Sequence, residues 1–182
     1  MTEPSPKELP RAFISSTILG LPEHQVAAVD ACLRVGAEPI IVEFDPTSDT
    51  GLQVQSLAAL DRADIYIGIF AGRYGFVSPG QEKSLTELEY EHAVELGIPR
   101  LIFIMGVDHP VRLADVETGP NATKLQSFKT AIRKKNIVAE FRSADELKAA
   151  IVTSLVKVLS NSTQQSKAPA AFLFQKKIIL FS

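Results

Sequence analysis

The chain has 182 residues, 46% of them hydrophobic and 22% charged, which is the composition of an ordinary globular protein of about one domain. Its 19 basic and 21 acidic residues give a formal net charge of −2. This balance argues against a dedicated nucleic-acid-binding domain, which concentrates positive charge on one face. The single cysteine, Cys32, excludes a disulfide framework and a cysteine-rich zinc site. The three histidines show no metal-ligand spacing, so no metal is expected.

The amino terminus and the hydropathy pattern predict the compartment. Residues 1–13 contain no apolar core of the kind that a signal peptide needs. The sequence has no run of about 18 apolar residues that would predict a transmembrane helix. We therefore expect a cytoplasmic protein with no membrane association.

Predicted strands and helices alternate along the chain. Short apolar runs bounded by turn residues predict buried strands, and apolar residues at intervals of three or four predict helices. The order begins with a strand at 12–14, a helix between Pro22 and Gly36, a strand at 39–42 and a helix at 52–60. It continues with a strand at 65–70, a glycine-rich loop at 71–80, a helix at 85–96 and a strand at 101–104. An irregular connection at 105–120, a helix at 125–134, a strand at 137–139 and a helix after Ser143 complete it.

This alternation predicts the fold class. Parallel strands joined by right-handed helical crossovers form an α/β sheet with helices on both faces. We expect a flavodoxin-like, doubly wound sheet of five parallel strands in the order 2-1-3-4-5. Ligands in such sheets bind beyond the carboxyl ends of the strands, near the switch between the first and third strands. This rule selects residues 15–20, 43–49 and 71–89.

The flanks of the chain differ from its centre in composition. Residues 1–10 carry three prolines and predict a flexible lead-in. The α/β domain is expected at 11–160, followed by a polar linker at 161–171. An apolar tail at 172–182 is consistent with an edge strand, a partner-binding segment or the first element of another domain.

Two segments at the predicted carboxyl edge could bind a ligand. Ser15, Ser16 and Thr17 offer hydroxyls and free backbone N–H groups to a phosphate or ribose, although such residues also cap turns. In the turn Gly72–Gly75, Arg73 could bind a phosphate or carboxylate and Tyr74 could stack on a base. A purely structural turn, in which Arg73 pairs with a nearby carboxylate, explains the same pattern.

The helix at 85–96 carries the candidate catalytic residue. Leu85, Leu88 and Leu96 predict its buried stripe and place Glu89 at the margin of that stripe. A carboxylate at the mouth of the cleft could stabilise an oxocarbenium-like sugar centre or act on it as a nucleophile. The alternative is a solvated helix face, which is the commoner role of such glutamates.

The segments Phe13–Thr17, Ala63–Gly75 and Leu85–Ala93 together resemble the DUF4062 domain, in order and in spacing. That family is grouped with TIR-like and nucleoside deoxyribosyltransferase-like proteins, and its members stand at the amino terminus of larger proteins with signalling ATPase or repeat regions. In deoxyribosyltransferases, a Gly-Thr-x-x-Glu segment carries the nucleophilic glutamate. Thr86 and Glu89 fall at its Thr and Glu, while Leu85 replaces the glycine. The resemblance therefore implies that Glu89 is the catalytic carboxylate.

The resemblance implies an activity and leaves one alternative. The first reading is cleavage of the N-glycosidic bond of NAD or a related nucleotide, without metal or separate cofactor, in signalling or defence. The second is a non-catalytic domain that self-associates, joins a larger signalling protein or senses a nucleotide, which the departures from the family pattern at Gly20 and Gln25 favour. The residues expected to contact the substrate lie in the matching segments: Ser15, Ser16, Thr17, Asp64, Gly72, Arg73, Tyr74 and Thr86.

Overall fold

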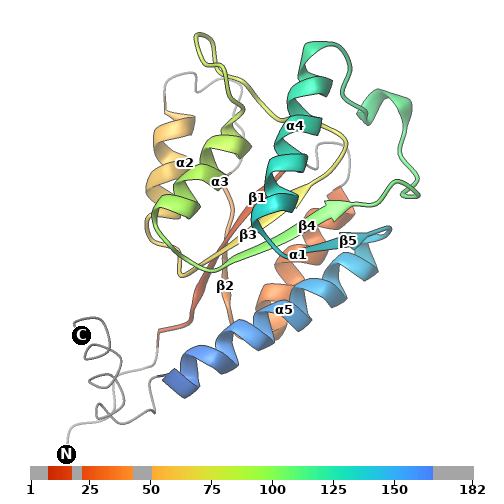
Figure 1. Cartoon of the computed structure of the whole chain (residues 1–182). Coiled ribbons are helices and arrows are strands. Elements are labelled where there is room, and N and C mark those ends of the chain that lie inside the picture. The colour runs from red at the N-terminus through yellow and green to blue at the C-terminus, as the bar shows by residue number, and fades with distance from the viewer. Residues whose placement is uncertain (1–7, 18–21, 43–50, 166–182) are drawn as a thin grey trace, which may run out of the picture.

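The computed structural model describes residues 8–17, 22–42 and 51–165. Strands and helices alternate through this part of the chain (Figure 1). The strands are β1 (Arg11–Ser16), β2 (Glu38–Ile40), β3 (Ile65–Phe70), β4 (Arg100–Met105) and β5 (Val138–Phe141). The helices are α1 (Pro22–Arg34), α2 (Leu52–Leu60), α3 (Leu85–Glu95), α4 (Pro120–Lys135) and α5 (Ala144–Gln165), with a short 3-10 helix η1 (Leu113–Asp115) before α4.

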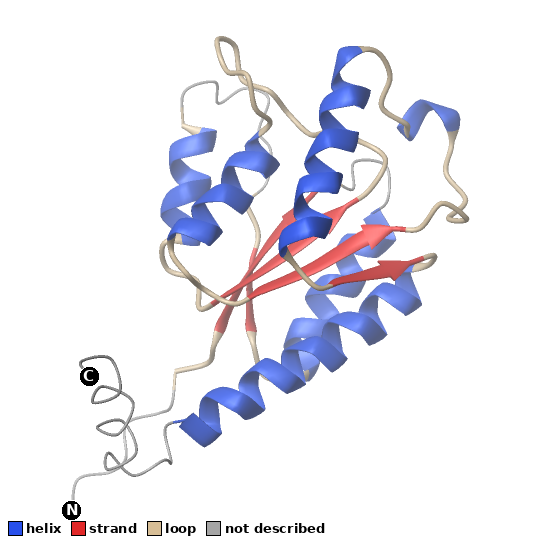
Figure 2. Ribbon diagram, viewed as in Figure 1, coloured by secondary structure: helices blue, strands red, loops and turns tan. Residues whose placement is uncertain are grey.

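The five strands form one parallel sheet in the order β2-β1-β3-β4-β5. Their arrows point the same way in Figure 2, so their carboxyl ends share one edge. This confirms the predicted doubly wound α/β fold and its strand order. The chain reverses its direction of winding between β1 and β3, where Ser15 lies opposite Gly68. That reversal marks the place where ligands bind in sheets of this kind.

Helices cover both faces of the sheet. Figure 1 shows α2, α3 and α4 on one side and α1 and α5 on the other. Ile65, Ile67 and Ile69 of β3 pack in the core beneath α1 and α5, whereas Tyr66 and Phe70 pack in the core beneath the other three helices. Every residue of β3 is buried. This is the environment that its nearly continuous apolar sequence predicts.

Two helices are longer than their predicted bounds. Helix α4 begins at Pro120, whose ring suits the first turn of a helix, rather than at Leu125. Helix α5 runs to Gln165 and so extends into the stretch expected to be a linker. The apolar tail at 172–182 and residues 1–7 of the expected lead-in lie outside the described residues. None of the helices in the described part of the chain is long and apolar enough to cross a membrane.

Candidate functional site

The Glu89 side chain points from α3 into the protein interior, whereas the sequence predicts that it lies at the margin of the buried face of the helix. Its buried residues are spaced at helical intervals and are Thr86, Glu89, Tyr90 and Ala93. The predicted leucine stripe is wrong, because Leu85 and Leu88 are only half-buried and Leu96 is 40% exposed. Aromatic packing decides the orientation, since the Tyr90 ring meets Tyr66 edge-on and also contacts Phe128.

Two serine hydroxyls hold the Glu89 carboxylate. Ser15, near the end of β1, donates a hydrogen bond to Oε2 at 2.6 Å. Ser56, on α2, donates to Oε1. Glu89 is only 6% exposed, and both serines are buried. Within the described residues, no Lys, Arg or His side chain forms an ion pair with this carboxylate. Among the described residues, the Glu89 carboxylate is therefore held by hydroxyl hydrogen bonds and has no cationic partner.

Burial governs the ionisation of this cluster. Loss of solvent raises the pKa of Glu89, while the hydrogen bonds from Ser15 and Ser56 act in the opposite direction. Burial, and then the neighbouring Glu89 carboxylate, also raise the pKa of Tyr66 well above its ordinary value. The Tyr66 hydroxyl is fully buried and has no hydrogen-bond partner in the described part of the chain. The site thus places a carboxyl group of raised pKa beside a buried phenol whose pKa is also raised.

A glycine in β3 allows the rings beside this cluster to pack closely. Gly68 lies opposite Ser15 in the sheet, between Tyr66 and Phe70 on the same face of the strand. A Cβ atom at Gly68 would come within 2.8 Å of both rings. Because aromatic rings already fill this space, no larger side chain fits there without moving them.

The loop after β3 packs against the same edge. The Thr17 hydroxyl accepts a hydrogen bond from the backbone N–H of Ala71 at 2.9 Å. A Cβ atom at Gly75 would lie 3.0 Å from Thr86 Oγ1 and 3.5 Å from Thr17 Cγ2. The structure therefore brings Ser15, Thr17, Thr86 and Glu89 to one part of the carboxyl edge, as the switch-point rule predicts.

Gly72 and Arg73 face the connection between β4 and α4. The Arg73 guanidinium donates a hydrogen bond to the carbonyl of Ala114 at 2.6 Å, and the carbonyl of Gly72 accepts one from the N–H of Glu117 at 2.7 Å. A Cβ atom at Gly72 would lie 2.9 Å from the carbonyl oxygen of Asp115. These contacts match the structural turn that the sequence left open as an alternative, although Arg73 bonds a carbonyl rather than a carboxylate.

Tyr74 also has a structural role, because it links the loop after β3 to Glu117 and to Glu87 of α3. Its backbone N–H donates to a Glu117 carboxylate oxygen at 3.0 Å, and its hydroxyl donates to Glu87. Burial, followed by the hydrogen bond to Glu87, raises the pKa of Tyr74 to about 12. Tyr74 is 2% exposed, so its surface is already covered by protein.

Two predicted contact residues lie apart from Glu89. Ser16 follows Ser15 in β1, so strand alternation directs it to the other face of the sheet. Asp64 precedes β3 and accepts a hydrogen bond from the N–H of Arg11 at 2.7 Å. Because Arg11 begins β1, Asp64 lies at the edge where the strands start, opposite the carboxyl edge.

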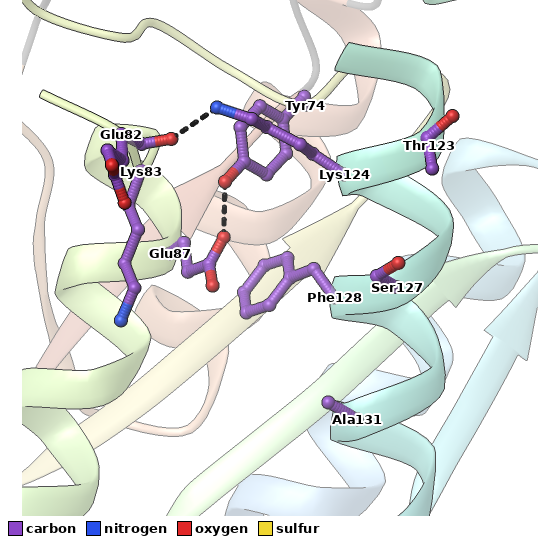
Figure 3. A pocket seen from close by; sticks show the side chains of 9 residues that line it. All are labelled: Tyr74, Glu82, Lys83, Glu87, Thr123, Lys124, Ser127, Phe128 and Ala131. Carbon is purple, nitrogen blue, oxygen red and sulfur yellow. Dashed lines mark hydrogen bonds between the residues drawn. The ribbon is translucent and has the colours of Figure 1, made fainter. Parts of the chain in front are cut away.

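An open pocket of about 600 Å³ lies between α3 and α4. In Figure 3, Glu87 of α3 and Phe128 of α4 approach each other beside Tyr74, and Lys124 reaches across to the carbonyl of Glu82. Glu87 and Glu89 lie on different sides of α3, and Glu89 does not line this pocket. Tyr74 is the only predicted contact residue in the lining, which consists of Tyr74, Glu82, Lys83, Glu87, Thr123, Lys124, Ser127, Phe128 and Ala131.

Two residues near the carboxyl edge, Ser56 and Lys129, are not predicted from the sequence. Ser56 stands in the buried stripe of α2 with Leu52, Ala59 and Leu60, so its helical spacing among apolar residues was an available signal. Lys129 lies in a basic segment that resembles a solvated helix face. Instead, it donates to the carbonyl of Ala71 at 2.6 Å. Burial, and then Arg133, lower the pKa of Lys129 to about 8.

The parallel sheet, its strand order and the polar cluster at the switch point define a doubly wound α/β domain of flavodoxin-like class. Residues 11–156 match a family described as "Domain of unknown function (DUF4062)". Because this match covers most of the sequence, the chain belongs to that family. A comparison with curated proteins finds no significant match. In the described ranges, no three His, Cys, Asp or Glu side chains gather to hold a metal ion.

Proposed function

We propose that this domain cleaves the N-glycosidic bond of NAD or a related nucleotide, with Glu89 as the catalytic carboxylate. The observation that carries the proposal is the buried Glu89 side chain at the switch point, held by two serines and without a cationic partner among the described residues. Burying an unpaired carboxylate costs stability, so a carboxylate kept in such a place is a candidate functional group.

The chemistry needs one carboxylate and water. As the bond from C1′ of the ribose to the base nitrogen breaks, its electron pair leaves with the base and positive charge develops on the sugar. The Glu89 carboxylate stabilises that charge, and water then adds at C1′ and loses a proton. With NAD, the products are nicotinamide and ADP-ribose. Because Glu89 is only 6% exposed, the side chains around it must move before a ribose can reach the carboxylate.

The resemblance to TIR-like and deoxyribosyltransferase-like proteins supports the same assignment. Thr86 and Glu89 match the Thr and Glu of the deoxyribosyltransferase segment, and both are buried on the same side of α3. In a TIR-like setting, the reaction would serve signalling or defence, within a larger signalling protein or a homo-oligomer.

A second function, nucleotide binding without cleavage, is favoured by a different observation. The Glu89 carboxylate is closed off by Ser15 and Ser56, whereas the pocket between α3 and α4 is open and carries polar groups of both charges. A domain that senses a ligand in this pocket would need no reactive carboxylate. The two functions predict different effects of removing the charge of Glu89.

The test measures, by chromatography, how much free base the protein releases from NAD and from a panel of nucleosides and nucleotides. Wild-type protein is expected to release nicotinamide or a free base, and Glu89→Gln is expected to release none. Glu91→Gln is the matched control, because Glu91 lies on the same helix but pairs with Lys83 at the surface. It should retain the wild-type rate.

Other outcomes separate the two functions. Binding of a nucleotide by wild type and by Glu89→Gln, with no base released at any protein concentration, would support the sensor and contradict the glycosidase. The assay is run at low and at high protein concentration, because self-association could complete the site.

A further inference from the structure

Two buried histidines, distant in the sequence, meet at the carboxyl edge on the α1 side of the sheet. His24 lies in the first turn of α1, and His109 lies in the connection that follows β4. Their Nε2 atoms are 2.9 Å apart and their ring centroids 4.8 Å apart. The exposed fractions are 2% for His24 and 8% for His109. The imidazoles therefore form a direct hydrogen bond away from solvent.

The neighbouring groups assign the tautomers of this pair. Nδ1 of His109 lies 2.9 Å from the carbonyl oxygen of Pro110, which can only accept, so this nitrogen carries a hydrogen. In a neutral His109 the Nε2 atom is then an acceptor, and Nε2 of His24 must be the donor. One hydrogen thus lies between the rings. A further proton on Nε2 of His109 would place two N–H groups 2.9 Å apart with no acceptor between them, and the hydrogen bond would be lost.

At His24, burial outweighs the one nearby carboxylate. Phe141 of β5 covers both rings with an apolar side chain. From α1, the Glu23 carboxylate lies 3.4 Å from Nδ1 of His24, but this side chain is 59% exposed. Burial, followed by His109, lowers the pKa of His24, and Glu23 opposes this only in part. Burial therefore disfavours the charged form of His24 in this position.

The pair fastens a connection that also contacts the loop after β3. Near its start, the N–H of Gly106 donates to the carbonyl of Phe141 at 2.8 Å, and His109 bonds His24. Further along, Ala114 and Glu117 hold the turn at 72–74 through the hydrogen bonds described above. Release of His109 would therefore loosen a segment that supports the edge carrying Thr17 and Glu89.

We propose that His24 and His109 form a proton-sensitive latch: uptake of one proton by the neutral pair releases residues 106–119, and with them the turn at 72–74, from the carboxyl edge of the sheet. The proposal is independent of any catalytic role of Glu89, because it concerns the attachment of the connection alone.

The direction of the pH dependence follows from linkage. His24 is harder to protonate in the latched state than in an opened state, where its pKa returns toward 6.5. The opened state therefore binds more protons as the pH falls below that value. The latch is fully closed above it, and the opening equilibrium constant should rise by up to about tenfold for each pH unit below it.

Amide hydrogen exchange of residues 106–119 tests the latch at about pH 7.5 and about pH 5.5, after correction for intrinsic exchange rates. In wild type, protection should fall at the lower pH by up to about tenfold. His24→Gln retains an N–H donor toward His109 but cannot titrate, so its protection should stay nearly constant. His92→Gln is the control, because His92 lies on α3 and bonds Asp61. It should behave as wild type.

Two results would overturn the proposal. One is equal protection of 106–119 in wild type at both pH values. The other is the wild-type fall in protection persisting in His24→Gln. A second measurement needs no variant: imidazole ¹⁵N shifts at neutral pH should show hydrogen on Nδ1 of His109 and on Nε2 of His24. The opposite tautomers, or a charged ring, would contradict the latch even if the variant failed to fold.

Discussion

At the scale of the residue, Glu89 shows how hydroxyls can hold a buried carboxylate that has no cationic partner in the described part of the chain. Hydrogen bonds to an ionised group are stronger than those between neutral groups, so Ser15 and Ser56 offset part of the cost of burial. The offset is incomplete, because the pKa of Glu89 remains raised. A residue that opposes the stability of the fold in its charged form is a strong candidate for a functional role.

The first prediction concerns stability and pH. The pKa of Glu89 is higher in the folded than in the unfolded state, so its contribution to stability is fully present below about 4.5 and is lost as the pH rises through the folded pKa. Glu89→Gln removes this titration. Relative to wild type, the variant should therefore gain free energy of unfolding as the pH rises from 4 to 7. Urea unfolding at several pH values measures this, and a constant difference between the proteins would contradict it.

The second prediction concerns Ser56. Ser56→Ala removes a hydrogen-bond donor from a buried carboxylate and should lower the free energy of unfolding by about 2 kcal/mol at neutral pH. Ser160→Ala removes an exposed hydroxyl on α5 and should change it by less than about 0.5 kcal/mol. Equal effects of the two substitutions would show that the hydroxyl of Ser56 does not stabilise the carboxylate.

At the scale of the element, α3 separates two polar surfaces. Glu89 faces β1 and α2, whereas Glu87 faces α4 and the open pocket. Residues two positions apart in a helix point in different directions, so neighbouring glutamates can have unrelated roles. The loop after β3 touches both surfaces, because Tyr74 bonds Glu87 and Gly75 packs on Thr86.

The third prediction tests how closely that loop must pack. Gly75 and Gly97 both have positive φ, of 98° and 68°, but a Cβ atom at Gly97 meets open space and one at Gly75 meets Thr86. Gly97→Ala should cost about 1 kcal/mol from backbone conformation alone. Gly75→Ala should cost more, because Thr86 and the loop must also move apart. Thermal unfolding of the two variants gives the comparison, and a smaller loss at Gly75 would show that the loop yields easily.

The sequence predicts elements better than the faces they bury. The apolar run of β3 predicts a strand covered on both sides, and the structure confirms it. The leucines of α3 predict the wrong buried face, because Tyr90 packs against Tyr66 and Phe128. The helix therefore buries Tyr90 and Glu89 in preference to leucine. Periodicity reports which residues share a face, but only the neighbouring elements determine which face is covered.

At the scale of the whole molecule, two helical layers position the carboxyl edge. Helix α5 spans the sheet beside α1, with Leu147, Ile151 and Leu155 fully buried in the core that also holds Ile67 and Ile69. The layer of α2, α3 and α4 on the opposite face carries the residues that reach Glu89 and the pocket. The first layer therefore stabilises the sheet, and the second supplies the candidate site.

The fourth prediction separates these two layers. Ile151→Ala leaves a cavity among fully buried side chains and should lower the free energy of unfolding by about 2–5 kcal/mol. Val156→Ala, at a position 49% exposed on the same helix, should cost less than about 1 kcal/mol. Urea unfolding tests both, and similar losses would contradict the assignment of α5 to the core.

The candidate site is only partly predictable because long-range contacts build it. The switch-point rule correctly brings Ser15, Thr17 and Glu89 to one edge. It does not reveal Ser56, because that contact joins helices whose packing the sequence leaves open. Nor does it reveal that His24 and His109, 85 residues apart, share a hydrogen bond. Asp64 shows the converse. It lies in a segment that matches the family and was expected to contact substrate, but it is at the opposite edge of the sheet, beside Arg11.

The measurement that tests the central claim most directly is the rate of nicotinamide release from NAD by wild-type protein and by Glu89→Gln at equal concentration, with unfolding curves confirming that both are folded. Wild type should release nicotinamide, and the variant should lose at least about a hundredfold in rate, which is the effect of removing one group that stabilises transition-state charge. Equal rates in two folded proteins would remove Glu89 from the chemistry and contradict the proposed function.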